Sequence, residues 1–125
     1  MVLNPDCIRD ILLWVEETST FGTPFEFPHD MPSSLANKYS IDEIRYHLEQ
    51  CRQSELIRTE KWDIVLNLAI WDLTPKGHSF VANIRESGNW SSVKGIAKKL
   101  GSASLDAITQ IASQVISNLI QNQLR

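Results

Sequence analysis

The fold of this chain is decided by residues 40–57, which read SIDEIRYHLEQCRQSELI. Ser40 and Glu43 form a capping box, in which each side chain bonds the other residue's backbone N–H at the start of a helix. The apolar residues behind the box recur every three or four positions and predict one buried helix face, made of Ile44, Leu48 and Cys51. We expect this helix to end near Gln53 and a strand to follow at residues 56–60.

Three elements are expected before this helix. Asn4 is a capping residue and Pro5 suits a first helical position, so we predict a helix from here to about Thr18. Residues 24–28 alternate apolar and polar side chains between two prolines. This pattern is typical of a very short edge strand, because proline cannot donate to a neighbouring strand. Residues 30–37 predict one or two helical turns.

Four more elements are expected after the strand at residues 56–60. A second strand is predicted at residues 68–73, with the connecting turn at residues 63–67. A threonine and a proline at residues 74–75 cap and start a helix. The apolar spacing then predicts two further helices, around residues 90–100 and 104–124.

This order of elements is the plan of a winged helix–turn–helix. We therefore predict an α+β, mostly α-helical fold. A winged-helix domain with a short β-hairpin wing is expected over residues 1–86, followed by two added C-terminal helices over residues 90–125. We expect this extension to be an oligomerisation or partner-binding element.

The composition is that of one globular domain. The chain has 125 residues, of which 42% are hydrophobic and 22% are charged. Cys7 and Cys51 lie on apolar helix faces, so we expect buried, reduced thiols. Residues 1–6 lack the pattern of a signal peptide, and no window of about 18 apolar residues occurs. We therefore predict a cytoplasmic protein that does not bind a membrane.

The net charge of −3 is unevenly distributed along the chain. Residues 1–61 contain 6 basic and 11 acidic side chains, whereas residues 62–125 contain 6 basic and 4 acidic ones. Phosphate contacts dominate nucleic-acid affinity, so an acidic N-terminal half argues against strong DNA binding. The basic cluster of the chain is Lys94, Lys98 and Lys99, which either contacts phosphate or an acidic partner, or is simply solvated.

Two segments resemble bacterial winged-helix repressors. Residues 44–57 resemble their recognition helix and first wing strand, although Glu55 stands where glycine is usual and Cys51 where leucine is usual. Residues 73–80 begin with the pattern Leu-Thr-x-x-Gly and resemble the start of the helix that follows the wing.

Nearly the whole chain resembles a family of small uncharacterised proteins from bacterial genomes and their phages, domain-of-unknown-function family twenty-five thirteen. The matching segments are residues 4–9, 46–48, 73–80, 83–85 and 101–111. The resemblance implies a winged-helix fold and a phage or prophage origin. It carries over no catalytic residue, and a fold alone does not give a function.

The outward face of the expected recognition helix and the wing supply candidate DNA contacts. The candidates are Arg45, Tyr46, Gln50 and Gln53 on the helix, and Arg58 and Lys61 on the wing. Arg45 and Gln50 could reach base edges. Tyr46 could contact a phosphate, and Arg58 and Lys61 could hold the DNA backbone. The acidic residues of the same helix, which would repel phosphates, are Asp42, Glu43 and Glu49.

The last predicted helix carries a broad apolar face. Its members recur every three or four positions and are Leu105, Ile108, Ile111, Ala112, Val115, Ile116, Leu119 and Ile120. The opposite face is polar but almost uncharged, unlike that of a membrane-surface helix. The helix either packs back on its own domain or forms the interface of a homodimer or another protein partner. The width of the face favours the second alternative.

The sequence contains no pattern that indicates catalysis, a cofactor or a metal site. It has no nucleophile elbow, glycine-rich phosphate loop or paired-carboxylate motif. His29, His47 and His78 lack neighbouring ligands at the spacing that a metal needs. Two hypotheses follow. The motif favours a transcriptional regulator that binds double-stranded DNA. The charge distribution favours a non-enzymatic protein-interaction module, such as a phage-encoded modulator of a host protein, that uses the winged helix as a scaffold.

Overall fold

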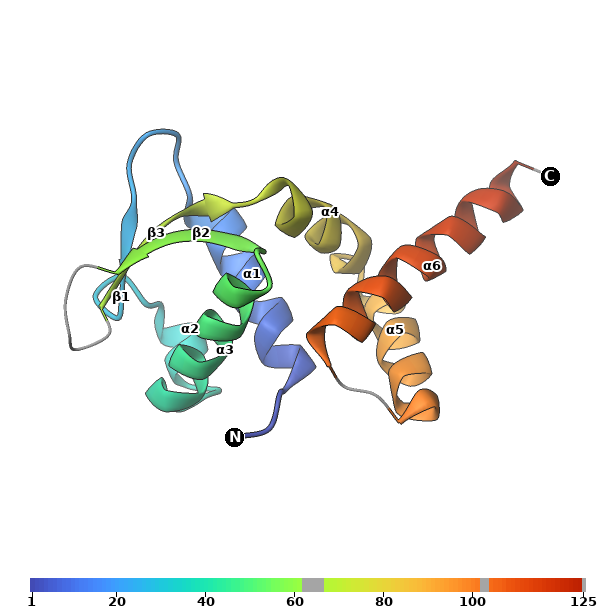
Figure 1. The fold of residues 1–125 in the computed structure, drawn as a ribbon, viewed down its shortest axis with the longest axis horizontal. Coiled ribbons are helices and arrows are strands. Elements are labelled where there is room, and N and C mark those ends of the chain that lie inside the picture. The colour runs from blue at the N-terminus through green and yellow to red at the C-terminus, as the bar shows by residue number, and fades with distance from the viewer. Residues whose placement is uncertain (62–66, 102–103, 125) are drawn as a thin grey trace.

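A computed structural model of this protein describes residues 1–61, 67–101 and 104–124. The elements in these residues are α1 (Pro5–Thr18), β1 (Phe25–Phe27), α2 (Ser33–Ala36), α3 (Ile41–Gln53), β2 (Ile57–Lys61), β3 (Leu68–Leu73), α4 (Pro75–Ile84), α5 (Ser87–Leu100) and α6 (Leu105–Gln123). The fold is α+β and mostly helical, as predicted. Its order of elements is compatible with a winged helix (Figure 1).

The three strands form one antiparallel sheet in the order β1–β3–β2. β1, the strand between two prolines, lies at an edge as predicted. β2 and β3 pair from Ile57 opposite Leu73 to Lys61 opposite Leu68, which is the antiparallel pair expected for the wing. Most of the turn predicted at residues 63–67 lies outside the described residues.

One hydrophobic core connects α1, α3 and the sheet with the C-terminal helices. Its fully buried side chains include Ile8, Ile11, Leu12, Phe27, Ile44, Leu48, Ile70, Ile84 and Ile108. Cys7 and Cys51 are buried and free, as predicted. Burial raises the pKa of Cys7 to about 12, which keeps this thiol protonated at neutral pH.

The helices α3 and α4 begin at the capping residues that the sequence predicts. The Ser40 hydroxyl accepts the Glu43 N–H at 3.1 Å, and the Glu43 carboxylate accepts the Ser40 N–H at 3.2 Å, so the capping box is present. The Thr74 hydroxyl accepts the Gly77 N–H at 3.0 Å at the start of α4. These bonds satisfy backbone N–H groups that a helix start leaves unpaired.

The start of α5 corrects the prediction. The helix begins at Ser87 and not at Trp90, because the Glu86 carboxylate accepts the N–H groups of Gly88 and Asn89 at 2.9 and 2.8 Å. The same two bonds hold the pKa of Glu86 below its ordinary value. The sequence does not indicate this first turn, because its small and polar residues carry no apolar spacing.

A left-handed residue ends α3 and sets the direction of β2. Glu55 has a φ of 60°. The Leu56 N–H bonds the Cys51 carbonyl at 2.9 Å, and the Glu55 N–H bonds the Arg52 carbonyl at 3.0 Å, which is a Schellman ending. Such a φ favours glycine, the residue usual here in the repressors that this segment resembles. Because Leu56 belongs to the helix ending, β2 starts at Ile57, one residue later than predicted.

Helix α4 approaches the α3–β2 turn so closely that only glycine fits at the contact. A Cβ atom on Gly77 would lie 2.0 Å from the Leu56 carbonyl oxygen. The same oxygen accepts the Thr74 N–H at 3.0 Å, and the Thr74 hydroxyl donates to the Glu55 carbonyl at 2.5 Å. These contacts fix the direction in which the chain leaves the sheet.

His47 joins α3 to the start of α1 and is almost completely buried. Its Nε2 accepts the Asn4 N–H at 2.8 Å, so Nδ1 carries the proton and donates to the Glu43 carbonyl at 2.6 Å. Both ring nitrogens are therefore engaged within the fold. The described residues contain no group of three side chains that could hold a metal ion.

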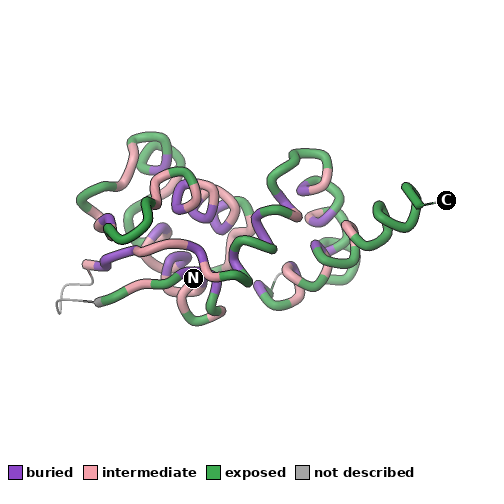
Figure 2. Tube along the Cα trace, turned by 90° about the horizontal axis from the view of Figure 1, so that it is seen from above, coloured by how far each residue is buried: buried purple, intermediate pink, exposed green. Residues whose placement is uncertain are grey.

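Helices α5 and α6 pack with α4 at the end of the molecule away from the sheet (Figure 1). Leu105, Ile108 and Ala112 in the first half of α6 are buried. The last turns of α6 extend beyond the rest of the protein and are exposed (Figure 2). No helix within the described ranges is long and apolar enough to cross a membrane. The division of the chain into domains at residues 86–90 stays a prediction.

We predict that Gly77→Ala lowers the free energy of unfolding by about 1–3 kcal/mol, because the added methyl group must displace the Leu56 carbonyl. Gly95→Ala in α5 is the matched control. Its Cβ would meet no atom within 4 Å, and alanine at an exposed helix position stabilises by about 0.5–1 kcal/mol. Urea unfolding of both variants measures the difference. Equal stability of the two would contradict the close approach of α4.

We also predict that His47→Leu lowers the free energy of unfolding by about 1–3 kcal/mol, because the Asn4 N–H loses its acceptor. His78→Leu is the control. That imidazole is about half exposed, 3.7 Å from Asp72, so its removal should cost less than about 0.5 kcal/mol. Thermal unfolding compares the two variants. A loss no larger for His47→Leu would mean that its two bonds add nothing to stability.

Candidate functional site

The arginine of the candidate DNA-reading face is packed against the sheet. The Arg45 guanidinium carbon lies 5.6 Å from the centre of the Phe27 ring, and Nη1 lies 3.7 Å from the Asp42 carboxylate. Its Nε is buried without a hydrogen-bond partner among the described residues, and the side chain is 27% exposed. Arg45 therefore contributes to packing as well as to surface charge, and only part of its guanidinium faces solvent.

The other polar residues of α3 contact one another. Arg52 forms a two-bond ion pair with Glu49, and this carboxylate also accepts the Gln53 amide N–H at 3.1 Å. The hydrogen bonds that Arg52 donates to the Glu49 carboxylate hold the pKa of Arg52 above its ordinary value. Tyr46 packs edge-on against His47, with ring centres 4.9 Å apart, and Gln50 is partly exposed. The charges of α3 are thus largely compensated within the helix.

On the wing, Arg58 is exposed and its guanidinium carbon lies 5.8 Å from the centre of the Trp71 ring. Lys61 ends β2, and its side chain lies outside the described residues. Arg58 therefore lies on β2, the strand next to α3, and α3 carries the other candidate DNA contacts. Residues 40–61 together hold five acidic and four basic side chains, so this part of the chain carries no net positive charge.

The predicted apolar face of α6 is divided between the core and solvent. Leu105, Ile108 and Ala112 are buried, and Ile111 and Val115 pack against the core. This half of the helix packs back on its own domain, which is the first of the two alternatives. Farther along, Ile116 is half-buried. The exposed members of the face are Leu119 at 44% and Ile120 at 54%, joined by Leu124 at 82%, which was not among the predicted residues.

A polar contact between α1 and α5 was not predicted from the sequence. The Asp6 carboxylate accepts the Trp90 indole N–H at 2.8 Å and pairs with the Lys94 ammonium at 2.9 Å. Burial opposes ionisation of Asp6, but these two bonds outweigh it and hold its pKa below the ordinary value. The sequence shows Lys94 only as part of a basic cluster, because its partner lies 88 positions away in the sequence.

Arg9 makes a second long-range contact from α1. Its Nε donates to the Ile84 carbonyl at 3.0 Å and its Nη2 to the Arg85 carbonyl at 2.7 Å. Arg85 in turn forms an ion pair with Glu16 of α1. Two of the segments that carry the family resemblance, residues 4–9 and 83–85, therefore meet at the C-terminal end of α4.

Tyr39 closes a polar cluster between α1 and the loop before α3. Its hydroxyl donates to the Asp10 carboxylate at 2.7 Å, and Lys38 lies 3.4 Å from the same oxygen. Burial and the bond to Asp10 raise the pKa of Tyr39 above its ordinary value. The phenol therefore stays protonated and serves as a donor that connects two elements.

Comparisons with known proteins match this chain to one uncharacterised group. The model of a family described as hypothetical protein DUF2513 matches residues 2–104, which include α1 to α5. An uncharacterised protein from Haemophilus influenzae is 29% identical over 123 residues, which cover 96% of this chain and 99% of that protein. No solved structure matches the chain. The family model confirms the resemblance inferred from residues 4–9, 46–48 and 73–80, and the chain belongs to the DUF2513 family.

Proposed function

We propose that this protein is a non-enzymatic, self-associating winged-helix protein that forms a homodimer through the exposed half of α6. The observation that carries the proposal is an apolar stripe of Ile116, Leu119, Ile120 and Leu124, here called the α6 stripe. Leu119 continues the face that the first half of α6 buries in the core, and Ile116, Ile120 and Leu124 follow one another every four residues beside it. Adjacent apolar side chains left in water are a typical feature of protein interfaces.

A second copy of the chain is the partner that this stripe fits best. Residues 113–124 contain no acidic, basic or histidine side chain, so two copies of the helix meet without like-charge repulsion. A charged partner would find no complementary charge on this surface. Serine, asparagine and glutamine side chains flank the stripe, and they can form hydrogen bonds with the corresponding side chains of a second copy. In a helix pair with two-fold symmetry, both copies contribute the same residues to the interface.

The winged-helix assignment rests on the order of elements. The sequence of α3, β2 and β3 is that of a recognition helix followed by a wing, and β3 lies between β1 and β2 in the sheet. Because α6 extends away from the sheet end of the molecule (Figure 1), a pair of α6 helices would hold two such domains apart. The dimer would therefore present two copies of α3.

We predict that Leu119→Asp weakens self-association at least about 100-fold. Each Leu119 buried in the dimer contributes about 1.5–3 kcal/mol, and a symmetric dimer loses two of them. Gln114→Glu adds the same charge at an exposed position of α6 that is not three, four or seven residues from any member of the stripe, and it is the control. Sedimentation equilibrium over a range of protein concentrations measures the association. A wild-type protein that stays monomeric at about 100 µM, or equal weakening by both variants, would reject the dimer.

DNA binding is a second candidate function, favoured by the exposed Arg58 on the wing beside α3. A dimer would contact two half-sites, one with each α3. Compensation of the α3 charges by Asp42 and Glu49 limits the affinity. We therefore expect weak, salt-sensitive binding to double-stranded DNA with little dependence on sequence.

Arg58→Ala is a sharper test of this candidate than Arg45→Ala, because Arg45 also packs on Phe27. We predict that Arg58→Ala reduces the affinity for a labelled duplex several-fold at low salt and lowers the slope of log affinity against log salt by about 1. Lys99→Ala, a cation on α5, should leave both unchanged. Fluorescence anisotropy provides the measurement. No wild-type binding at low salt would assign α3 and the wing a purely structural role.

A further inference from the structure

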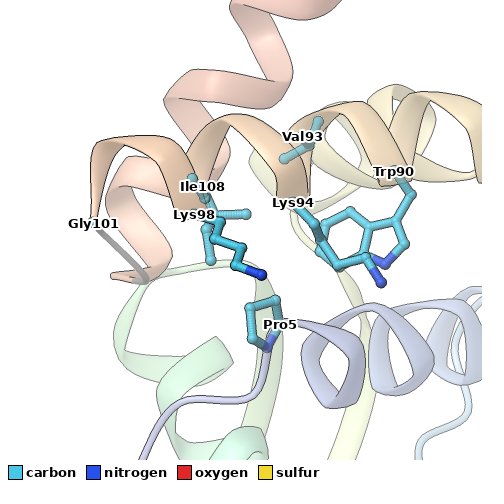
Figure 3. Close-up of a pocket in the computed structure, with 8 residues that line it drawn as sticks. Pro5, Trp90, Val93, Lys94, Lys98, Gly101 and Ile108 are labelled. Atoms are coloured by element: carbon cyan, nitrogen blue, oxygen red, sulfur yellow. The ribbon is translucent and has the colours of Figure 1, made fainter.

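A pocket with a volume of about 290 Å³ lies between the start of α1, the inner face of α5 and the first turns of α6. Its walls are mostly carbon and come from Pro5, Trp90, Val93, Ala97 and Ile108. Figure 3 shows Lys94 and Lys98 extending from α5 toward α1 beside these walls. The pocket therefore combines an apolar interior with two ammonium groups.

The walls of the pocket are held in place by contacts outside it. Val93 and Ile108 are buried in the core, and Ala97 is only 7% exposed. The Trp90 ring is fixed by its N–H bond to Asp6 at 2.8 Å. A cavity with rigid walls binds a ligand without first losing conformational entropy, which is a general property of small-molecule sites.

The two lysines differ in how their charges are compensated. The Lys94 ammonium pairs with Asp6 at 2.9 Å and lies 5.7 Å from the centre of the Trp90 ring. The Lys98 side chain is exposed, and its ammonium forms no hydrogen bond or ion pair with the described residues. The positive end of the α1 dipole also points to this region, because Pro5 is the first residue of that helix. Within residues 1–61, 67–101 and 104–124, one positive charge at the pocket therefore has no partner.

We propose that this pocket binds a small amphiphilic carboxylate, with its apolar chain against Trp90 and Ile108 and its carboxylate at Lys98. The volume equals that of roughly ten water molecules in the liquid, which suits a ligand of about ten non-hydrogen atoms. Octanoate has this size. The pocket is too small for a peptide helix, and its wall offers few polar groups to a sugar or a nucleotide.

The charge of the ligand is tested by a titration of the full-length, ¹⁵N-labelled protein, followed at the Trp90 indole N–H resonance. We expect octanoate to shift this resonance saturably. Octan-1-ol, which has the same chain without the charge, should bind about two- to fivefold more weakly, the difference expected for one ion pair at an exposed lysine. No saturable shift at millimolar octanoate, or equal affinity for octanol, would overturn the proposal.

The position of the carboxylate is tested by Lys98→Glu, which should weaken octanoate binding about tenfold or more by reversing the unpaired charge. Lys99→Glu makes the same change in net charge one residue away, at a lysine that does not line the pocket, and should bind octanoate within twofold of the wild-type affinity. Equal weakening by both variants would mean that octanoate responds only to the net charge of the protein, and it would reject the site.

The position of the chain is tested by Ala97→Leu, which fills the pocket from the α5 side and should abolish the saturable shift. Lys98→Glu lies on the surface and keeps the proposal testable if the larger side chain disturbs folding. The proposal does not rest on the dimer, because Leu119 does not line the pocket. Leu119→Asp should therefore bind octanoate as wild type does. Octanoate binding retained in a folded Ala97→Leu protein would place the ligand elsewhere.

Discussion

The arrangement of the C-terminal half depends on one close contact, between Gly77 of α4 and the Leu56 carbonyl at the end of α3. This carbonyl also accepts the Thr74 N–H, so the chain that leaves β3 is bonded to the chain that enters β2. A backbone carbonyl inside a turn cannot move without breaking that turn. The direction of α4, and with it the positions of α5 and α6, follows from this constraint.

Helix α1 then holds the two halves of the molecule together. At its start, Asn4 bonds His47 of α3 and Asp6 bonds Trp90 of α5. One turn later, Arg9 bonds the last carbonyls of α4. Each of these bonds is directional and joins a different neighbour, whereas the apolar core alone would allow the helices to rotate or slide. The polar residues of α1 therefore specify the arrangement that the core stabilises.

The pairing of charges within the fold decides which surface groups remain available to bind other molecules. The charges of α3 are paired within that helix, since Arg52 bonds Glu49 and Arg45 contacts Asp42. Two surfaces take no part in the contacts of the fold: the uncharged α6 stripe, and the apolar pocket beside Lys98, whose ammonium has no partner among the residues that the structure describes. The stripe lies on the last turns of α6, whereas the pocket lies between α1, α5 and the first turns of α6, so the two surfaces are separate.

The sequence by itself determined the elements and most of their ends, because caps and apolar spacing are local: Ser40 with Glu43 starts α3, and Thr74 starts α4. It also identified the broad apolar face of α6, but not how much of it is covered. Only the tertiary structure decided that Ile108 is buried while Leu119 is exposed, because that depends on where α4 and α5 end beside it. The Lys98 pocket likewise required the structure, since its walls meet from residues 5, 90 and 108, and separations of this length leave no periodic signal in a sequence.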